Sequence, residues 1–78
     1  MVISTLPTSK DALTVLEIVV VHGSASTASI GRRCGWDDNR ADRALAETIQ
    51  NGWVLSLGNG IYDASYEGHI ELRWRGAT

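Results

Sequence analysis

The chain has 78 residues, of which 44% are hydrophobic and 21% charged, a balance that excludes a disordered protein and fits one small globular domain over residues 1 to 78. Its net charge of −2, from seven basic and nine acidic side chains, excludes the strongly basic class of nucleic-acid-binding domains, so any DNA contact needs locally placed cations. The single cysteine, the lack of a signal-peptide pattern and the lack of a membrane-length apolar run favour a soluble protein of the reducing cytoplasm, with no membrane contact.

The first expected element is a helix that runs to about His22. Thr8-Ser9-Lys10-Asp11 has the hydroxyl cap and acidic first turn of a helix N-terminus, and Gly23 is placed as its stop. The β-branched run Ile18-Val19-Val20-Val21 suits a strand better, but a segment of about 13 residues is too long for an ordinary strand. A helix is therefore predicted, with an apolar arc of Ala12, Leu13, Val15, Leu16, Val19 and Val20.

A short second helix is expected from Ala28 to Cys34. The hydroxyl-rich turn Ser24-Ala25-Ser26-Thr27 can cap it, and Gly35 ends it. Ile30 and Cys34 lie four residues apart and share its inner face.

A third helix, from about residue 38 to residue 50, has the clearest periodicity. Trp36 fills the turn before it, Asp37 or Asp38 caps it, and Asn51-Gly52 closes it. Its inward positions are Ala41, Ala44, Leu45, Thr48 and Ile49.

A β-hairpin should follow the third helix. WVLSL and IYDAS have the composition of strands, and they flank Gly58-Asn59-Gly60, whose residues tolerate positive φ. For residues 69 to 75 the sequence is compatible with either a strand or a helix. Alternation of apolar residues favours a third strand, whereas Ser65 can cap a short helix that ends at Gly76 and pairs Ile70 with Trp74.

The order of helix, short capped helix, turn, helix and hairpin resembles that of winged helix-turn-helix domains. STASIGRRCGWDDNRADRALAETIQNGWV looks like the core of many bacterial repressors of the multiple-antibiotic-resistance and arsenic-repressor types. The resemblance spans about residues 10 to 68 and implies an α+β fold, a three-helix winged helix-turn-helix with a C-terminal β-hairpin wing. The matching positions are Thr27, Ile30, Gly31, Cys34, Gly52, Trp53-Val54, the tip Gly58-Asn59-Gly60 and the segment from Tyr62 to Gly68.

This resemblance implies a transcriptional regulator that binds duplex DNA as a homodimer, and the small size favours a phage or mobile element as its source. The third helix would lie in the major groove, and two subunits would read half-sites about one helical turn apart. Asn39 can read adenine, and Arg40 and Arg43 can each bind guanine, while Arg32 and Arg33 would face phosphates. The outward face of the third helix would comprise Asn39, Arg40, Asp42, Arg43, Ala46 and Glu47.

Acidic residues weigh against this interpretation. Asp38 and Asp42 lie beside the arginines, and residues 53 to 68 contain no lysine or arginine, so such a wing would clamp phosphates poorly. For Arg40 and Arg43 the alternative is a solvated face with local pairing to acidic neighbours, which are Asp37, Asp38, Asp42 and Glu47.

An alternative function belongs to another class, a winged-helix protein-interaction module or a phage-type inhibitor that binds a protein complex through its acidic and aromatic surface. We expect Trp53 in the core and Trp36 and Trp74 partly exposed, and exposed tryptophan is enriched at protein interfaces. Such a surface fits a protein partner as well as it fits a twin subunit.

The sequence contains no pattern typical of an enzyme. There is no nucleophile elbow, no phosphate-binding glycine loop and no histidine with a partnered nucleophile, so we expect a non-enzyme without a cofactor. Cys34 is expected to be a small buried hydrophobe, and His22 to sit at a helix C-terminus where the dipole favours it. The spacing of His22, Cys34 and His69 is not that of a metal site.

Overall fold

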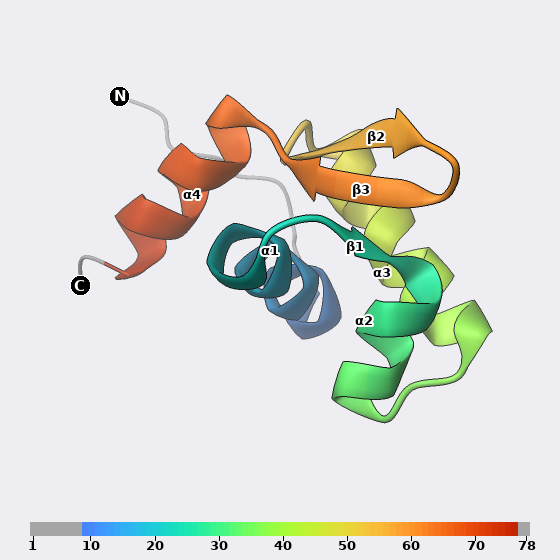
Figure 1. The fold of residues 1–78 in the computed structure, drawn as a ribbon. Coiled ribbons are helices and arrows are strands. Elements are labelled where there is room, and N and C mark those ends of the chain that lie inside the picture. Colours follow the sequence, from blue (N-terminus) through green and yellow to red (C-terminus); the bar gives the residue numbers. More distant parts are fainter. Residues whose placement is uncertain (1–8, 77–78) are drawn as a thin grey trace.

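Figure 1 shows a computed structural model that describes residues 9–76. This part of the chain is α+β, with four helices and one three-stranded antiparallel sheet. Residues 1–8 and 77–78, and with them Thr8 of the expected helix start, lie outside the described residues. In chain order the elements are α1 (Lys10–His22), β1 (Ala25–Ser26), α2 (Thr27–Cys34), α3 (Asp38–Gln50), β2 (Val54–Gly58), β3 (Ile61–Ala64) and α4 (Tyr66–Gly76).

The first three helices begin at polar caps. The side chains of Ser9, Ser26 and Asp37 accept hydrogen bonds from the backbone N–H groups three residues further along, at 3.1, 3.1 and 2.8 Å. The predicted bounds of α1 and α3 are confirmed, α2 begins one residue earlier than expected, and the cap of α3 is Asp37.

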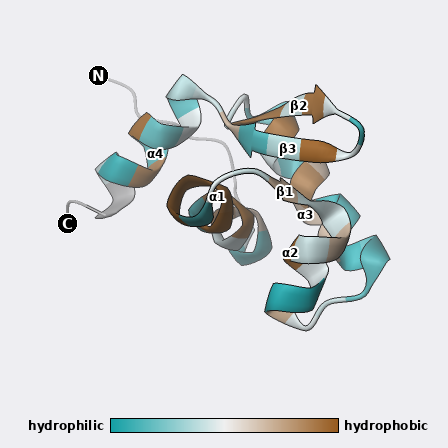
Figure 2. Cartoon of the chain, viewed as in Figure 1, coloured by the Kyte–Doolittle hydropathy of each residue, from teal (hydrophilic) through white to brown (hydrophobic). Residues whose placement is uncertain are grey.

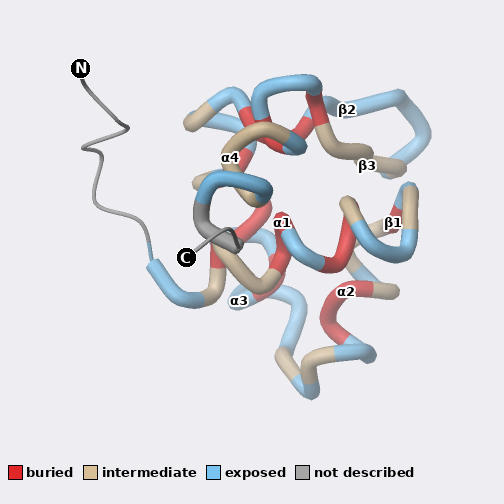
Figure 3. Tube along the Cα trace, turned by 90° about the vertical axis from the view of Figure 1, so that its left-hand side faces the viewer, coloured by how far each residue is buried: buried red, intermediate tan, exposed pale blue. Residues whose placement is uncertain are grey.

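The β-branched run of α1 is helical because the helix lies in the centre of the core. Figure 2 shows hydrophobic residues concentrated on α1, and Figure 3 shows buried segments of α1, α2 and α3 close together. Burial of one face outweighs the weak preference of valine and isoleucine for strands. The largest side chains that are fully buried are Leu16, Ile30, Val15, Val19, Val54 and Thr48.

One residue of the expected core of α3 is not buried. Ala41, Ala44, Leu45 and Thr48 are, but Ile49 is 41% exposed. Each helical residue turns by about 100°, so Ile49 points past the edge of the buried arc, towards the side of the exposed Asp42. The prediction that Ile49 faces the core was therefore wrong.

The sheet has the order β1-β3-β2. The expected hairpin is present, with Val54 opposite Ala64 and Ser56 opposite Tyr62, and its tip residues Gly58, Asn59 and Gly60 have φ of 94°, 55° and 74°. Strand β1 was expected to be only a turn. Its two residues pair with β3, and a strand of this length has no recognisable alternation in the sequence.

The segment that the sequence left open is helix α4. The hairpin was expected to be the last element, but α4 follows it. Ser65 accepts a hydrogen bond from the N–H of Gly68 at 3.0 Å, as the helical alternative required. A Cβ at Gly68 would overlap the carbonyl oxygen of Trp53 and would lie 3.1 Å from Leu16, so only glycine allows this approach. Helix α4 therefore packs closely on the core, on the opposite side of α1 from α2 (Figure 1).

Candidate nucleic-acid interface

The five residues predicted to bind DNA are all exposed, and they lie on two helices that pack together. Two belong to the last turn of α2 and three to the first two turns of α3. The turn between these helices is tight, because the N–H of Trp36 donates to the carbonyl of Gly31 at 2.8 Å and a Cβ at Gly31 would lie 3.0 Å from the Trp36 carbonyl oxygen. The five are Arg32, Arg33, Asn39, Arg40 and Arg43.

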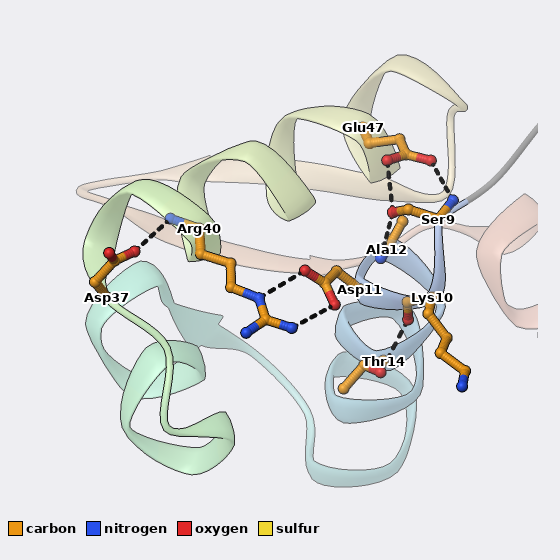
Figure 4. A network of polar contacts seen from close by, with 8 residues as sticks. All are labelled: Ser9, Lys10, Asp11, Ala12, Thr14, Asp37, Arg40 and Glu47. Carbon is orange, nitrogen blue, oxygen red and sulfur yellow. Dashed lines mark hydrogen bonds and ion pairs between the residues drawn. The ribbon is translucent and has the colours of Figure 1, made fainter.

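Arg40 forms a bidentate ion pair with Asp11 of α1. Its Nε donates to Oδ2 of Asp11 at 2.8 Å and its Nη2 donates to Oδ1 at 3.0 Å (Figure 4). The guanidinium carbon also lies 4.7 Å from the centroid of the Trp36 ring, within the range of a cation–π contact. Arg40 is thus an ion-paired residue, as the alternative held, but its partner is 29 residues away and is none of the expected neighbours.

The ion pair shifts the ionisation of both partners. The hydrogen bond from Arg40 lowers the pKa of Asp11, and the same bond raises the pKa of Arg40. Both side chains keep solvent contact, with 50% of Arg40 and 31% of Asp11 exposed, so water and salt screen the attraction. The pair therefore supports the packing of α3 on α1 mainly by its bidentate geometry, because neither charge is buried enough for a strong attraction.

A second contact ties the same side of α3 to the start of α1. Glu47 accepts hydrogen bonds from the backbone N–H and from the hydroxyl of Ser9, both at 2.8 Å (Figure 4). Arg40 and Glu47 are seven residues apart, which places them on one flank of the helix. Sequence reasoning assigned both to the outward face, because nothing in the local pattern indicates that the first turn of α1 packs there.

The remaining outward positions of α3 form a continuous ridge. Asn39, Arg43, Ala46 and Gln50 are all exposed and follow one another at intervals of four, three and four residues. Gln50 was missed as a candidate for DNA contact, although its position seven residues after Arg43 places it on the same side of the helix. Within residues 9–76, no ion pair within 4.0 Å involves Arg43.

A shallow hollow of about 500 Å³ lies beside the ion pair, between α1 and the start of α3. Arg33 and Lys10 border it, and Cys34 and Trp36 contribute apolar surface. Cys34 packs against the core but is only half-buried, so it is less buried than expected, and this burial raises the pKa of its thiol. Its thiolate is therefore disfavoured at neutral pH.

Apolar side chains are exposed on the hairpin and on α4. Leu55 and Leu57 of β2 are 53% and 58% exposed, in a segment without lysine or arginine. On α4, Tyr66 and Trp74 are 76% and 69% exposed and border a hollow of about 430 Å³ together with Ile70 and Arg73. The expected positions of the tryptophans are confirmed, since Trp53 is buried and Trp36 and Trp74 are not.

Among residues 9–76, no cluster of three or more histidine, cysteine, aspartate or glutamate side chains is arranged to hold a metal ion. In the same range, no helix combines the length and the apolar character needed to cross a membrane. No protein-family model matches the chain, and neither a curated protein nor a solved structure shows significant similarity to it.

Proposed function

We propose that this protein is a winged helix-turn-helix regulator of transcription that binds duplex DNA with α3 in the major groove. The observation that carries this proposal is the exposed ridge of α3, where Asn39 and Arg43 offer the amide and guanidinium groups that read adenine and guanine. Arg32 and Arg33, exposed at the end of α2, supply phosphate contacts. The hairpin of β2 and β3 takes the place of the wing.

The order of the elements supports this assignment. A short helix, a tight turn and a longer helix follow α1, and a hairpin with a glycine-rich tip follows them. Helix α4 adds an apolar outer face that suits a second subunit, and a dimer would let two copies of α3 read two half-sites. In a bacterial host, as the small size favours, a regulator of this kind acts in the cytoplasm.

Fluorescence anisotropy of a labelled random-sequence duplex, titrated at several salt concentrations, tests the proposal. We expect binding that weakens steeply as salt rises, because cations of the protein displace counterions from the phosphates. Alanine at Arg32 or at Arg33 should weaken binding to all sequences alike and lower the salt slope by about one. A folded wild-type protein that binds no duplex even at low salt would overturn the proposal.

A second function is favoured by one observation, the exposed leucines of the hairpin. Leu55 and Leu57 lie where a DNA-binding wing would need cations, and β2 is an edge strand of the sheet. Exposed apolar side chains on an edge strand suit a protein partner that adds a strand of its own. The same anisotropy experiment separates the two functions, because a protein-interaction module has no salt-dependent affinity for random duplexes.

A further inference from the structure

The Arg40 side chain is already engaged in the folded protein. Two of its N–H groups donate to the two carboxylate oxygens of Asp11, and its guanidinium stacks on Trp36. On α3 Arg40 lies roughly a quarter-turn away from the middle of the outward face, and its side chain reaches back to α1, so its guanidinium is directed away from the surface that would face the groove. Its contacts join the start of α3 to the start of α1.

The neighbouring ridge of α3 is different. The side chains of Asn39, Arg43 and Gln50 are exposed, and none of them has a hydrogen bond or ion pair with another residue of the described range 9–76. Acidic residues border the ridge on both flanks, with Asp38 and Asp42 beside Ile49 on one flank and Glu47, which binds Ser9, on the other. The ridge itself carries three polar side chains without a partner in the described range and no acidic residue.

We propose that Asn39, Arg43 and Gln50 are the residues that determine base specificity and that Arg40 is a positioning residue for α3. This inference rests on the proposed binding of duplex DNA. Asn39 and Gln50 read adenine through N6 and N7, and Arg43 reads guanine through O6 and N7. Ala46, between Arg43 and Gln50, is small enough to admit a thymine methyl group.

The spacing defines the class of site. A helix rises about 1.5 Å per residue, so Asn39 and Gln50 lie about 16 Å apart along α3, and base pairs of one strand follow every 3.4 Å or so. The ridge therefore spans at most about five base pairs, and fewer where α3 is inclined to the DNA axis. The predicted half-site has a guanine in its interior and an adenine towards each end.

Selection of bound duplexes from a random pool, followed by anisotropy on the selected site, tests this assignment. Asn39→Ala, Arg43→Ala and Gln50→Ala should each relax the preference at one position and weaken binding to the selected site about 5- to 150-fold. Arg43→Lys is the matched control for charge, since it keeps the attraction to phosphate but loses the bidentate fork. It should weaken the guanine preference while retaining binding to random duplexes, since lysine can still donate to guanine but without the fixed paired geometry.

Arg40→Ala and Asp11→Ala complete the set. Both should select the same bases as the wild type, and both should lower the thermal midpoint of unfolding, because they remove a contact between α1 and α3. The assignment is overturned if the wild type binds duplexes but Arg40→Ala changes the selected bases, or if the three ridge variants select the wild-type site. A wild type that binds no duplex overturns the proposed function itself, and the inference with it.

Discussion

Asp11 accepts two hydrogen bonds from Arg40, and this contact makes its ionisation matter to the packing of α3 on α1. Because its pKa in the folded protein is lowered, its contribution to stability is complete above the usual value of 3.8 and is lost as pH falls through the lowered pKa. We expect the thermal midpoint of the wild type to fall more steeply below about pH 4 than that of Asp11→Asn. Circular dichroism melts over a pH series measure this difference, and parallel curves for the two proteins would contradict it.

Asp37 and Asp38 are adjacent acidic residues with different structural surroundings. Only Asp37 accepts a hydrogen bond from the N–H of Arg40, so Asp37→Ala should lower the free energy of unfolding by about 1 kcal/mol. Asp38→Ala is the control, because it removes the same charge from the first turn without removing the cap. Urea denaturation gives both values. An equal loss in the two variants would mean that charge at the helix start, and not the cap, is what stabilises α3.

At the scale of single residues, the sequence predicts partners that are close along the chain and misses those that are not. The capping segments were predicted, with Asp37 as one of two candidates, because the capping oxygen and the N–H group that it binds lie within three residues of each other. The pairing of Arg40 with Asp11 and of Glu47 with Ser9 depends on how α1 packs on α3. No local pattern contains that information.

The same distinction applies to whole elements. Helices α1 and α3 have a cap, a stop and an apolar period, so their bounds were predicted correctly. Strand β1 has only two residues, and α4 has apolar residues on two faces, so neither has one clear period. The secondary structure of this segment is decided by the contact of Gly68 with the core, which is a tertiary feature.

Helix α4 gives a prediction at this scale. Gly68→Ala should destabilise the protein by about 1 to 3 kcal/mol, because the added methyl group overlaps the backbone carbonyl of Trp53. This result would run against helix propensity, which favours alanine over glycine by about 1 kcal/mol. His69→Ala changes the next residue, which is exposed, and should have little effect. Urea denaturation of both variants checks the prediction, and a Gly68→Ala protein at least as stable as the wild type would contradict this packing.

The whole molecule has a small core and much apolar surface. The Cα radius of gyration is 11.7 Å, close to the value of about 11 Å expected for a compact domain of this size. Such a small domain buries a limited share of its surface, and here the outer face of α4 exposes Tyr66 and Trp74 beside Ile70. These residues are four apart and form one stripe along the helix.

We expect this stripe to hold a homodimer at micromolar concentration. Trp74→Ala should shift the sedimentation equilibrium towards the monomer, because the indole is the largest exposed apolar group of the stripe. Leu57→Ala is the control, since it truncates a comparably exposed apolar side chain on the hairpin. A dimer lost in Leu57→Ala but kept in Trp74→Ala would move the interface to β2. A wild type that is monomeric at every concentration would remove the two-half-site arrangement.

The two contacts between α3 and the first turn of α1 also restrict a motion that a single contact would allow. A helix tied at one point can roll about its own axis, whereas Arg40 and Glu47 tie α3 at two points separated by seven residues on one flank. A roll of about 100° would bring a neighbouring row of side chains into the place of Asn39 and Arg43. Ser9 and Asp11 thus reinforce the rotational setting that the buried row of α3 establishes, although neither residue belongs to the outward surface.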